Sequence, residues 1–149
     1  AAESGSLQTQ LAQAFSTPEQ IASFMGYLQR VELGPDHILI NEGDPSEAMY
    51  FVDSGQVTAY LRAGGDRPVR LRSMSAGTVI GEIGLYLGQI RTATVHTTRP
   101  SVVYRLTQAS LREMEARHPE VAAALHQWMV RLLARRLTDT DQTLEVLLG

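Results

Sequence analysis

From Val31 onward the chain is divided into short apolar runs, each bounded by glycine, proline, asparagine or aspartate. The runs read VEL, HILI, AMYFV, VTAYLR, VRLRSM, TVI, TATVHTT and SVVYRL. Many short runs separated by turn residues are typical of the strands of an all-β sandwich, roll or barrel. Gly64-Gly65-Asp66 predicts a hairpin turn between two of them. We therefore expect an antiparallel, jelly-roll-like β-roll over residues 29–107.

The segments on either side of these runs have helical spacing. Leu7, Leu11 and Phe15 recur at the interval of one helix face, and Thr17-Pro18-Glu19-Gln20 is typical of a helix start. After the roll, Thr107 can cap a short helix, and Pro119 can begin a long helix of about 28 residues. We expect an α+β fold in one domain, residues 1–149, with N-terminal helices over 7–28 and C-terminal helices over 108–148.

Composition excludes several classes of protein. The 149 residues include no cysteine, so disulfide frameworks and cysteine-based zinc sites are excluded. No apolar run approaches the ~18 residues of a membrane span, and the start, AAESGSLQTQ, does not resemble a secretory signal. The net charge of −3 argues against a nucleic-acid-binding surface. We therefore expect no nucleic-acid partner for this segment.

Residues 81–95, GEIGLYLGQIRTATV, carry the pattern that indicates a ligand. Gly81 permits a close approach of the backbone, and the run after it can form a short helix whose amino end favours an anion. Arg91 offers a planar fork that suits phosphate oxygens, whereas Glu82 can accept hydrogen bonds from sugar hydroxyls. We also expect the apolar residues of this segment to pin it to the roll: Ile83, Leu85, Leu87 and Ile90. The alternative for Glu82 and Arg91 is a surface ion pair of little energetic value.

These residues resemble the cyclic nucleotide-binding domain family, which is shared by catabolite-activator-type regulators, cyclic-nucleotide-dependent kinases and gated channels. Residues 81–95 look like the phosphate-binding cassette of the family. A second signature, VELGPDHILINEGDPSEAMYFVDSGQV, has the family spacing at Gly34, Gly43-Asp44, the run Met49-Tyr50-Phe51-Val52, and Gly55. The resemblance covers about residues 31–148, and two signatures in the correct order are more specific than one motif.

The resemblance implies a role for each residue of the cassette. Glu82 would bind the ribose 2′-hydroxyl, and Arg91 the exocyclic oxygens of the cyclic phosphate. Backbone groups at Gly81, Thr92 and Ala93 would add contacts. The Thr92 hydroxyl would lie near phosphate and base, where it could also reach the amino group of guanine. We therefore expect cAMP as the ligand and leave cGMP open. The alternative is that Thr92 is only a β-branched residue suited to the start of a strand. The full set of expected ligand-binding residues is Gly81, Glu82, Ile83, Arg91, Thr92, Ala93, Arg136 and Thr140.

The last helix carries two overlapping signals. A heptad stripe runs along it, with one polar member: Leu133, Leu137, Thr140, Leu144 and Leu147. In catabolite-activator-like proteins a similar helix pairs two subunits, and residues just after an Arg-Arg-Leu reach the base. Here Arg135-Arg136-Leu137 is followed by Thr140-Asp141, so we expect Arg136 or Thr140 to touch the base, while the charge of Asp141 departs from the family pattern. The stripe predicts either a homodimer or packing on the roll of its own chain.

The remaining candidates have simpler interpretations. The four histidines, His37, His96, His118 and His126, lack the spacing of a metal site. Four arginines lie on one predicted hairpin: Arg62, Arg67, Arg70 and Arg72. They could form a nucleic-acid-binding patch, but we expect them to form a solvent-exposed face. Trp128 is expected to pack against the roll. No nucleophile motif or phosphate loop is present, so we expect neither an enzyme nor a bound cofactor.

We therefore expect a ligand sensor whose C-terminal helix moves as a lid and controls an output domain of a parent protein. The chain ends at Gly149 without a helix-turn-helix pattern, so the output is expected elsewhere. The parent would be a membrane transporter or channel, a Crp-like transcription regulator, or a stand-alone sensor. A degenerate domain that serves only for protein interaction is the alternative. The expected location is the cytoplasm, or the cytosolic part of a membrane protein.

Overall fold

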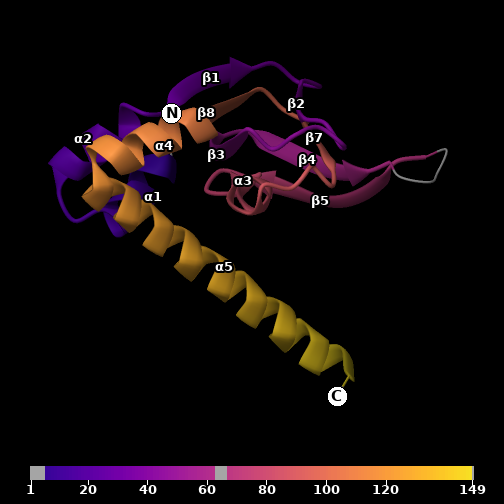
Figure 1. Cartoon of the computed structure of the whole chain (residues 1–149). Helices are drawn as coiled ribbons and strands as arrows, with labels where there is room; N and C mark the ends of the chain where they lie inside the picture. Colours follow the sequence, from indigo (N-terminus) through magenta and orange to yellow (C-terminus); the bar gives the residue numbers. More distant parts are fainter. Residues whose placement is uncertain (1–5, 63–66, 149) are drawn as a thin grey trace.

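The chain folds as an antiparallel β-roll with helices packed at one end (Figure 1). The structure, a computed structural model, describes residues 6–62 and 67–148. Its helices are α1 (Ser6–Ala14), α2 (Pro18–Met25), α3 (Glu82–Leu87), α4 (Gln108–Arg117) and α5 (Pro119–Leu148). Its strands are β1 (Gln29–Leu33), β2 (Ile38–Ile40), β3 (Ala48–Ser54), β4 (Gln56–Leu61), β5 (Val69–Ser75), β6 (Val79–Ile80), β7 (Thr94–Thr97) and β8 (Ser101–Thr107).

The strands form two antiparallel sheets of four, with the orders β1-β8-β3-β6 and β2-β7-β4-β5. Strands distant in sequence are neighbours in both sheets, because β8 lies between β1 and β3, and β7 lies between β2 and β4. The predicted α+β fold with a jelly-roll-like β-roll is thereby confirmed. The predicted hairpin turn at Gly64-Gly65-Asp66 lies outside the described residues, although β4 and β5 pair up to Leu61 and Val69.

The helix starts follow the predicted capping chemistry. The Thr17 hydroxyl accepts a hydrogen bond from the Gln20 N–H at 3.2 Å, with Pro18 at the first position of α2. Thr107 accepts from the Ser110 N–H at 3.0 Å in the same way and begins α4. In each case the hydroxyl satisfies a backbone donor that has no partner within the helix. Pro119 begins α5, which runs for 30 residues.

Two hydrophobic clusters hold these layers together. One lies between the sheets and includes Val57 and Val103, both fully buried. The other joins the N-terminal and C-terminal helices to β3 through an aromatic stack. Phe51 of β3 lies edge-on to Phe24 with a centroid separation of 5.8 Å, and Trp128 of α5 stacks on Phe51 at 5.6 Å. Trp128 therefore packs against the roll, as predicted.

The two halves of α5 have different surroundings. The first half is buried against the other helices and the roll, at Val121, Leu125 and Trp128 among others. The second half runs away from this helical cluster (Figure 1). Leu137, a member of the heptad stripe, is 65 % exposed. The alternative in which the whole stripe packs on its own roll is therefore wrong at this position. No helix in the described part of the chain is both long and apolar enough to span a membrane.

Candidate functional site

A cavity of about 610 Å³ opens between the second sheet, the cassette and α5. The sheet contributes apolar side chains to its wall, including Ile40, Ala59 and Val95. The cassette contributes the polar groups, and α5 closes one side with Arg136 and Asp139. A concave site with a few polar groups among apolar walls is the usual form of a small-molecule site.

Two glycines shape the backbone of the cassette, because they have backbone conformations that other residues rarely adopt. Gly81 and Gly88 flank α3 with φ values of 80° and 67°, in the left-handed region. A Cβ at Gly81 would also lie 2.8 Å from Nη1 of Arg91, which is closer than atoms pack. Gly81 is therefore required both for the turn and for the space that the guanidinium occupies.

Arg91 is fixed at both its side chain and its backbone. Its guanidinium is buried and donates through Nη1 to the Gly81 carbonyl at 2.9 Å and through Nη2 to the Ala48 carbonyl. Its backbone N–H donates to the Asp44 carbonyl at 2.8 Å, and its carbonyl accepts from the Gly43 N–H at 2.8 Å. Gly43-Asp44 of the second sequence signature thus fixes the backbone of Arg91 in the cassette. The pKa of Arg91 is lowered, because the effect of burial exceeds the opposite effect of the nearby Tyr50 and Glu82.

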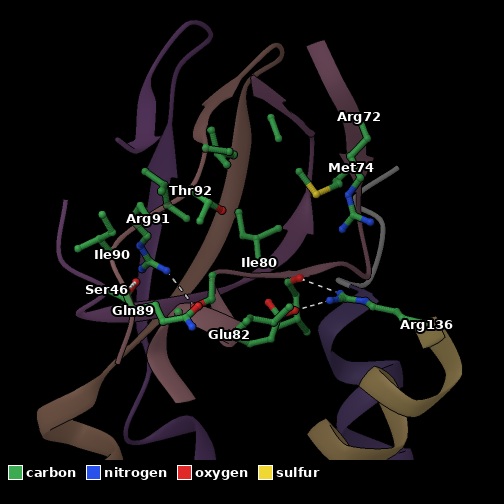
Figure 2. A pocket seen from close by; sticks show the side chains of 18 of the residues that line it. Ser46, Arg72, Met74, Ile80, Glu82, Gln89, Ile90, Arg91, Thr92 and Arg136 are labelled. Carbon is green, nitrogen blue, oxygen red and sulfur yellow. Dashed lines mark hydrogen bonds and ion pairs between the residues drawn. The ribbon is translucent and has the colours of Figure 1, made fainter. Parts of the chain in front are cut away.

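Glu82 lies at the start of α3 and is only 3 % exposed. Its carboxylate accepts a hydrogen bond from Nη1 of Arg136, whose Nη2 donates to the Val79 carbonyl at 3.0 Å. Figure 2 shows Arg136 reaching Glu82 from the α5 side, whereas Arg91 approaches the cavity from the opposite side. Within the described residues Glu82 is therefore paired with Arg136, and the interpretation of Glu82 and Arg91 as a surface ion pair is wrong.

The structure brings most of the expected ligand-binding residues to one cavity. Those that line it are Gly81, Glu82, Ile83, Arg91, Thr92, Ala93 and Arg136. Thr140 lies on α5, but its side chain is outside the described part of the structure. The expectation that four apolar residues pin the cassette to the roll holds only for Leu85, which is buried. It is wrong for Ile83, Leu87 and Ile90, which are 50 %, 64 % and 63 % exposed.

Sequence reasoning missed several residues of the cavity wall, notably Arg72, Met74 and Asp139. Arg72 and Met74 project into the cavity from β5 (Figure 2). Alternate residues of a strand share a face, so a prediction that Met74 faces the interior would also have placed Arg72 on that side. Asp139 follows Arg136 by three residues, which places it on the same side of the helix. In the described residues no cluster of histidine and carboxylate side chains could hold a metal ion.

Comparison with known proteins identifies the family. The family model for the cyclic nucleotide-binding domain matches residues 30–118, and the chain belongs to this family. A CRP-like cAMP-activated global transcriptional regulator of Mycobacterium tuberculosis is 30 % identical over 127 residues, which cover 85 % of this chain and 55 % of the relative. Glutaminase 2 of Bradyrhizobium diazoefficiens is 31 % identical over 109 residues, or 73 % of this chain and 17 % of that enzyme. The chain thus spans about half the length of the regulator.

Solved structures agree with this assignment. The catabolite activator protein of Thermus thermophilus superposes with a TM-score of 0.71 at 27 % identity, covering 89 % of this chain and 60 % of that one. A cyclic nucleotide-binding domain from Methylobacillus flagellatus superposes with a TM-score of 0.76 at 22 % identity, covering 83 % and 69 %. The second likeness is at the level of the fold.

The buried pair of Glu82 and Arg136 generates a prediction about stability. Arg136→Ala leaves a buried carboxylate without its cation and should lower the free energy of unfolding by about 1–3 kcal/mol, less than for a fully buried pair because Arg136 is partly exposed. In a Glu82→Gln background the same substitution should cost less than half as much, as a double-mutant cycle in urea would measure. The control is Arg135→Ala at the exposed neighbouring residue. Equal costs in both backgrounds would contradict the pairing.

Proposed function

We propose that this chain is a sensor domain that binds a cyclic nucleotide in the cavity and reports its occupancy through α5. The observation that carries the proposal is the convergence of the Glu82 carboxylate, the Arg91 guanidinium and the Arg136 guanidinium on one cavity. A cyclic nucleotide needs an anion site beside a hydroxyl acceptor, and these groups supply both. Membership of the family supports the same ligand class.

In this proposal Arg91 binds the exocyclic oxygens of the cyclic phosphate. Two carbonyls already hold its guanidinium, and an arginine has five N–H donors, so the fork can remain fixed while it binds the anion. Thr92 and Ala93 add contacts from the next two residues, and Gly81 provides space. Glu82 accepts a hydrogen bond from the ribose 2′-hydroxyl.

The coupling to the C-terminal helix follows from the partner of Glu82. A ribose hydroxyl at Glu82 competes for the oxygens that now accept from Arg136 of α5. Ligand binding therefore alters the attachment of α5 to the cassette, and we propose that this makes α5 the mobile lid. The ligand shifts the equilibrium between two positions of the helix by its difference in affinity for them.

We propose a regulatory role and no catalysis for this segment, without a cofactor and without nucleic acid as its own partner. Its output domain would lie in the rest of a larger cytoplasmic protein. A Crp-like transcription regulator is supported by the mycobacterial relative. A membrane transporter or channel remains the second candidate parent. A degenerate interaction domain is the other class of function, and the cavity with its polar groups favours a ligand-binding domain instead.

The test of this function is titration with cAMP and cGMP side by side. At a ligand concentration of about 100 times the dissociation constant, binding to the native state should add about 2.7 kcal/mol to the free energy of unfolding. Calorimetry gives the affinity, and thermal unfolding gives the stabilisation. A melting temperature unmoved by millimolar amounts of either nucleotide would favour the degenerate interaction domain.

Variants of the cavity make this test specific. Arg91→Ala should weaken binding by about 2–5 kcal/mol, because the phosphate loses a partner in a site shielded from water. Glu82→Ala should cost less, since it removes hydrogen bonds to neutral hydroxyls. Arg99→Ala is the matched control, as Arg99 is an exposed arginine outside the cavity. The phosphate role is refuted if Arg91→Ala binds within a few-fold of the wild-type protein.

We propose cAMP as the ligand, supported by the mycobacterial relative, which is described as cAMP-activated. Two residues keep cGMP as the alternative. The Thr92 hydroxyl can accept from the amino group of guanine, and Arg72 projects into the same cavity. An arginine fork matches O6 and N7 of guanine.

The base can be assigned by comparing both nucleotides on one variant. Thr92→Ala should weaken cGMP by about 3–10-fold, the range of one hydrogen bond, and cAMP by less. Calorimetric titration of wild-type protein and variant measures both losses. Equal losses for the two nucleotides would show that Thr92 does not distinguish the bases.

We also propose that α5 pairs two copies of the chain. Val130 and Leu137 are 66 % and 65 % exposed on its outer side, and Leu133 is half-buried between them. Leu137→Glu should leave the melting temperature of the monomer unchanged and shift the sedimentation of the protein from dimer toward monomer. Wild-type protein that sediments as a monomer at several hundred micromolar would rule out this pairing.

A further inference from the structure

A chain of polar contacts joins three helices outside the nucleotide cavity. The Tyr86 hydroxyl of α3 lies 2.9 Å from Nδ1 of His126 on α5. The other ring nitrogen of His126, Nε2, lies 3.1 Å from Oε2 of Glu115 on α4. The rings of Tyr86 and His126 also pack edge to face, with centroids 5.5 Å apart. These surface contacts connect the cassette helix to both C-terminal helices.

The surroundings of Tyr86 determine which hydrogen bonds this network of three side chains can make. Partial burial raises the pKa of Tyr86, which is 37 % exposed, and the charges of Glu115 and Glu82 raise it further. Tyr86 therefore keeps its proton, and its hydroxyl can donate a hydrogen bond to Nδ1 when the His126 ring carries its proton on Nε2, whose N–H then donates to Glu115. A protonated His126 can donate from both nitrogens, to the Tyr86 oxygen and to Glu115. Both charge states of the ring keep the three helices connected.

The cassette helix meets α5 at two points with different relations to the ligand. Glu82, at the start of α3, pairs with Arg136, and both residues line the cavity. Tyr86, at the end of α3, contacts His126, and neither residue lines it. The two contact points on α5 are ten residues apart, or about 15 Å along the helix. A nucleotide can therefore disturb one contact and leave the other intact.

The short helix between these contacts is suited to small rotations as a unit. Gly81 and Gly88, both in the left-handed region, flank its six residues. Leu85 is its one buried apolar side chain. Its position thus depends on Leu85 and on the polar contacts at its two ends.

We propose that Tyr86, His126 and Glu115 form a fixed pivot that joins the cassette helix to α4 and α5, about which α5 turns when a nucleotide takes the Glu82 carboxylate from Arg136. This inference rests on the proposed function for its ligand-driven part. The pivot transmits the change at Glu82 because it keeps one end of the contact between α3 and α5 in place.

The first experiment needs no ligand and measures amide hydrogen exchange in α3. Tyr86→Phe removes one hydroxyl, and His126→Phe keeps a ring at position 126 but removes both nitrogens. Each should speed exchange of the α3 amides by about 3–10-fold, the range of one hydrogen bond. The matched control is Tyr27→Phe, which removes the hydroxyl that lies 2.7 Å from Nδ1 of His118 at the end of α4. The pivot is refuted if α3 exchanges at the wild-type rate in both variants, or equally fast in the control.

The second experiment adds saturating cAMP or cGMP. Wild-type protein should show slower exchange over residues 81–93 and altered exchange over residues 127–137 of α5. Tyr86→Phe should retain the first change and lose most of the second, whereas Tyr27→Phe should retain both. Equal changes in α5 for wild type and Tyr86→Phe would overturn the pivot. Wild-type residues 81–93 that respond to neither nucleotide would overturn the proposed function and the ligand-driven turn, while the ligand-free comparison still decides whether the three residues attach α3.

Discussion

The site depends on the burial of one cation, the guanidinium of Arg91. A charge removed from water must be given hydrogen-bond acceptors, and here the carbonyls of Gly81 and Ala48 provide them. A Cβ at position 81 would enter the space of this group. The turn at Gly43-Asp44 holds the backbone of the same residue. Gly81 and Gly43, one glycine from each sequence signature, therefore both contribute to placing this arginine at the wall of the cavity.

Around this fixed point the structure separates a rigid part from an adjustable one. The rigid part is the roll, closed by the cluster between its sheets and joined to the helices by the Phe24, Phe51 and Trp128 stack. The adjustable part is α3, whose attachments are mainly polar and lie at its ends. Polar contacts can exchange with a ligand at small net cost, whereas interdigitated aromatic rings cannot. In the proposed function this segment therefore responds to a nucleotide while the roll stays unchanged.

The sequence predicted the features that depend on neighbouring residues. The caps at Thr17 and Thr107, the start of α5 at Pro119 and the segment carrying Glu82 and Arg91 all follow from local chemistry. It did not predict that Arg136 would be the partner of Glu82, because 54 residues separate them and their meeting depends on where α5 crosses the cassette. The inward position of Arg72 was missed because it was grouped with its charged neighbours. Ile83, Leu87 and Ile90 were misplaced because they were assigned to the interior on their apolar character alone, whereas only Leu85 of this segment joins the core.

The length of α5 would amplify a small movement at the cassette into a larger one at the far end of the helix. From the proposed pivot at His126, 22 further residues carry the helix to Leu148, a distance of about 33 Å. A rotation of about 5° about His126 would displace the end of the helix by about 2.9 Å. In the proposed function the helix acts as a lever, and the change of one hydrogen bond at Glu82 becomes a displacement of atomic dimensions at Leu148.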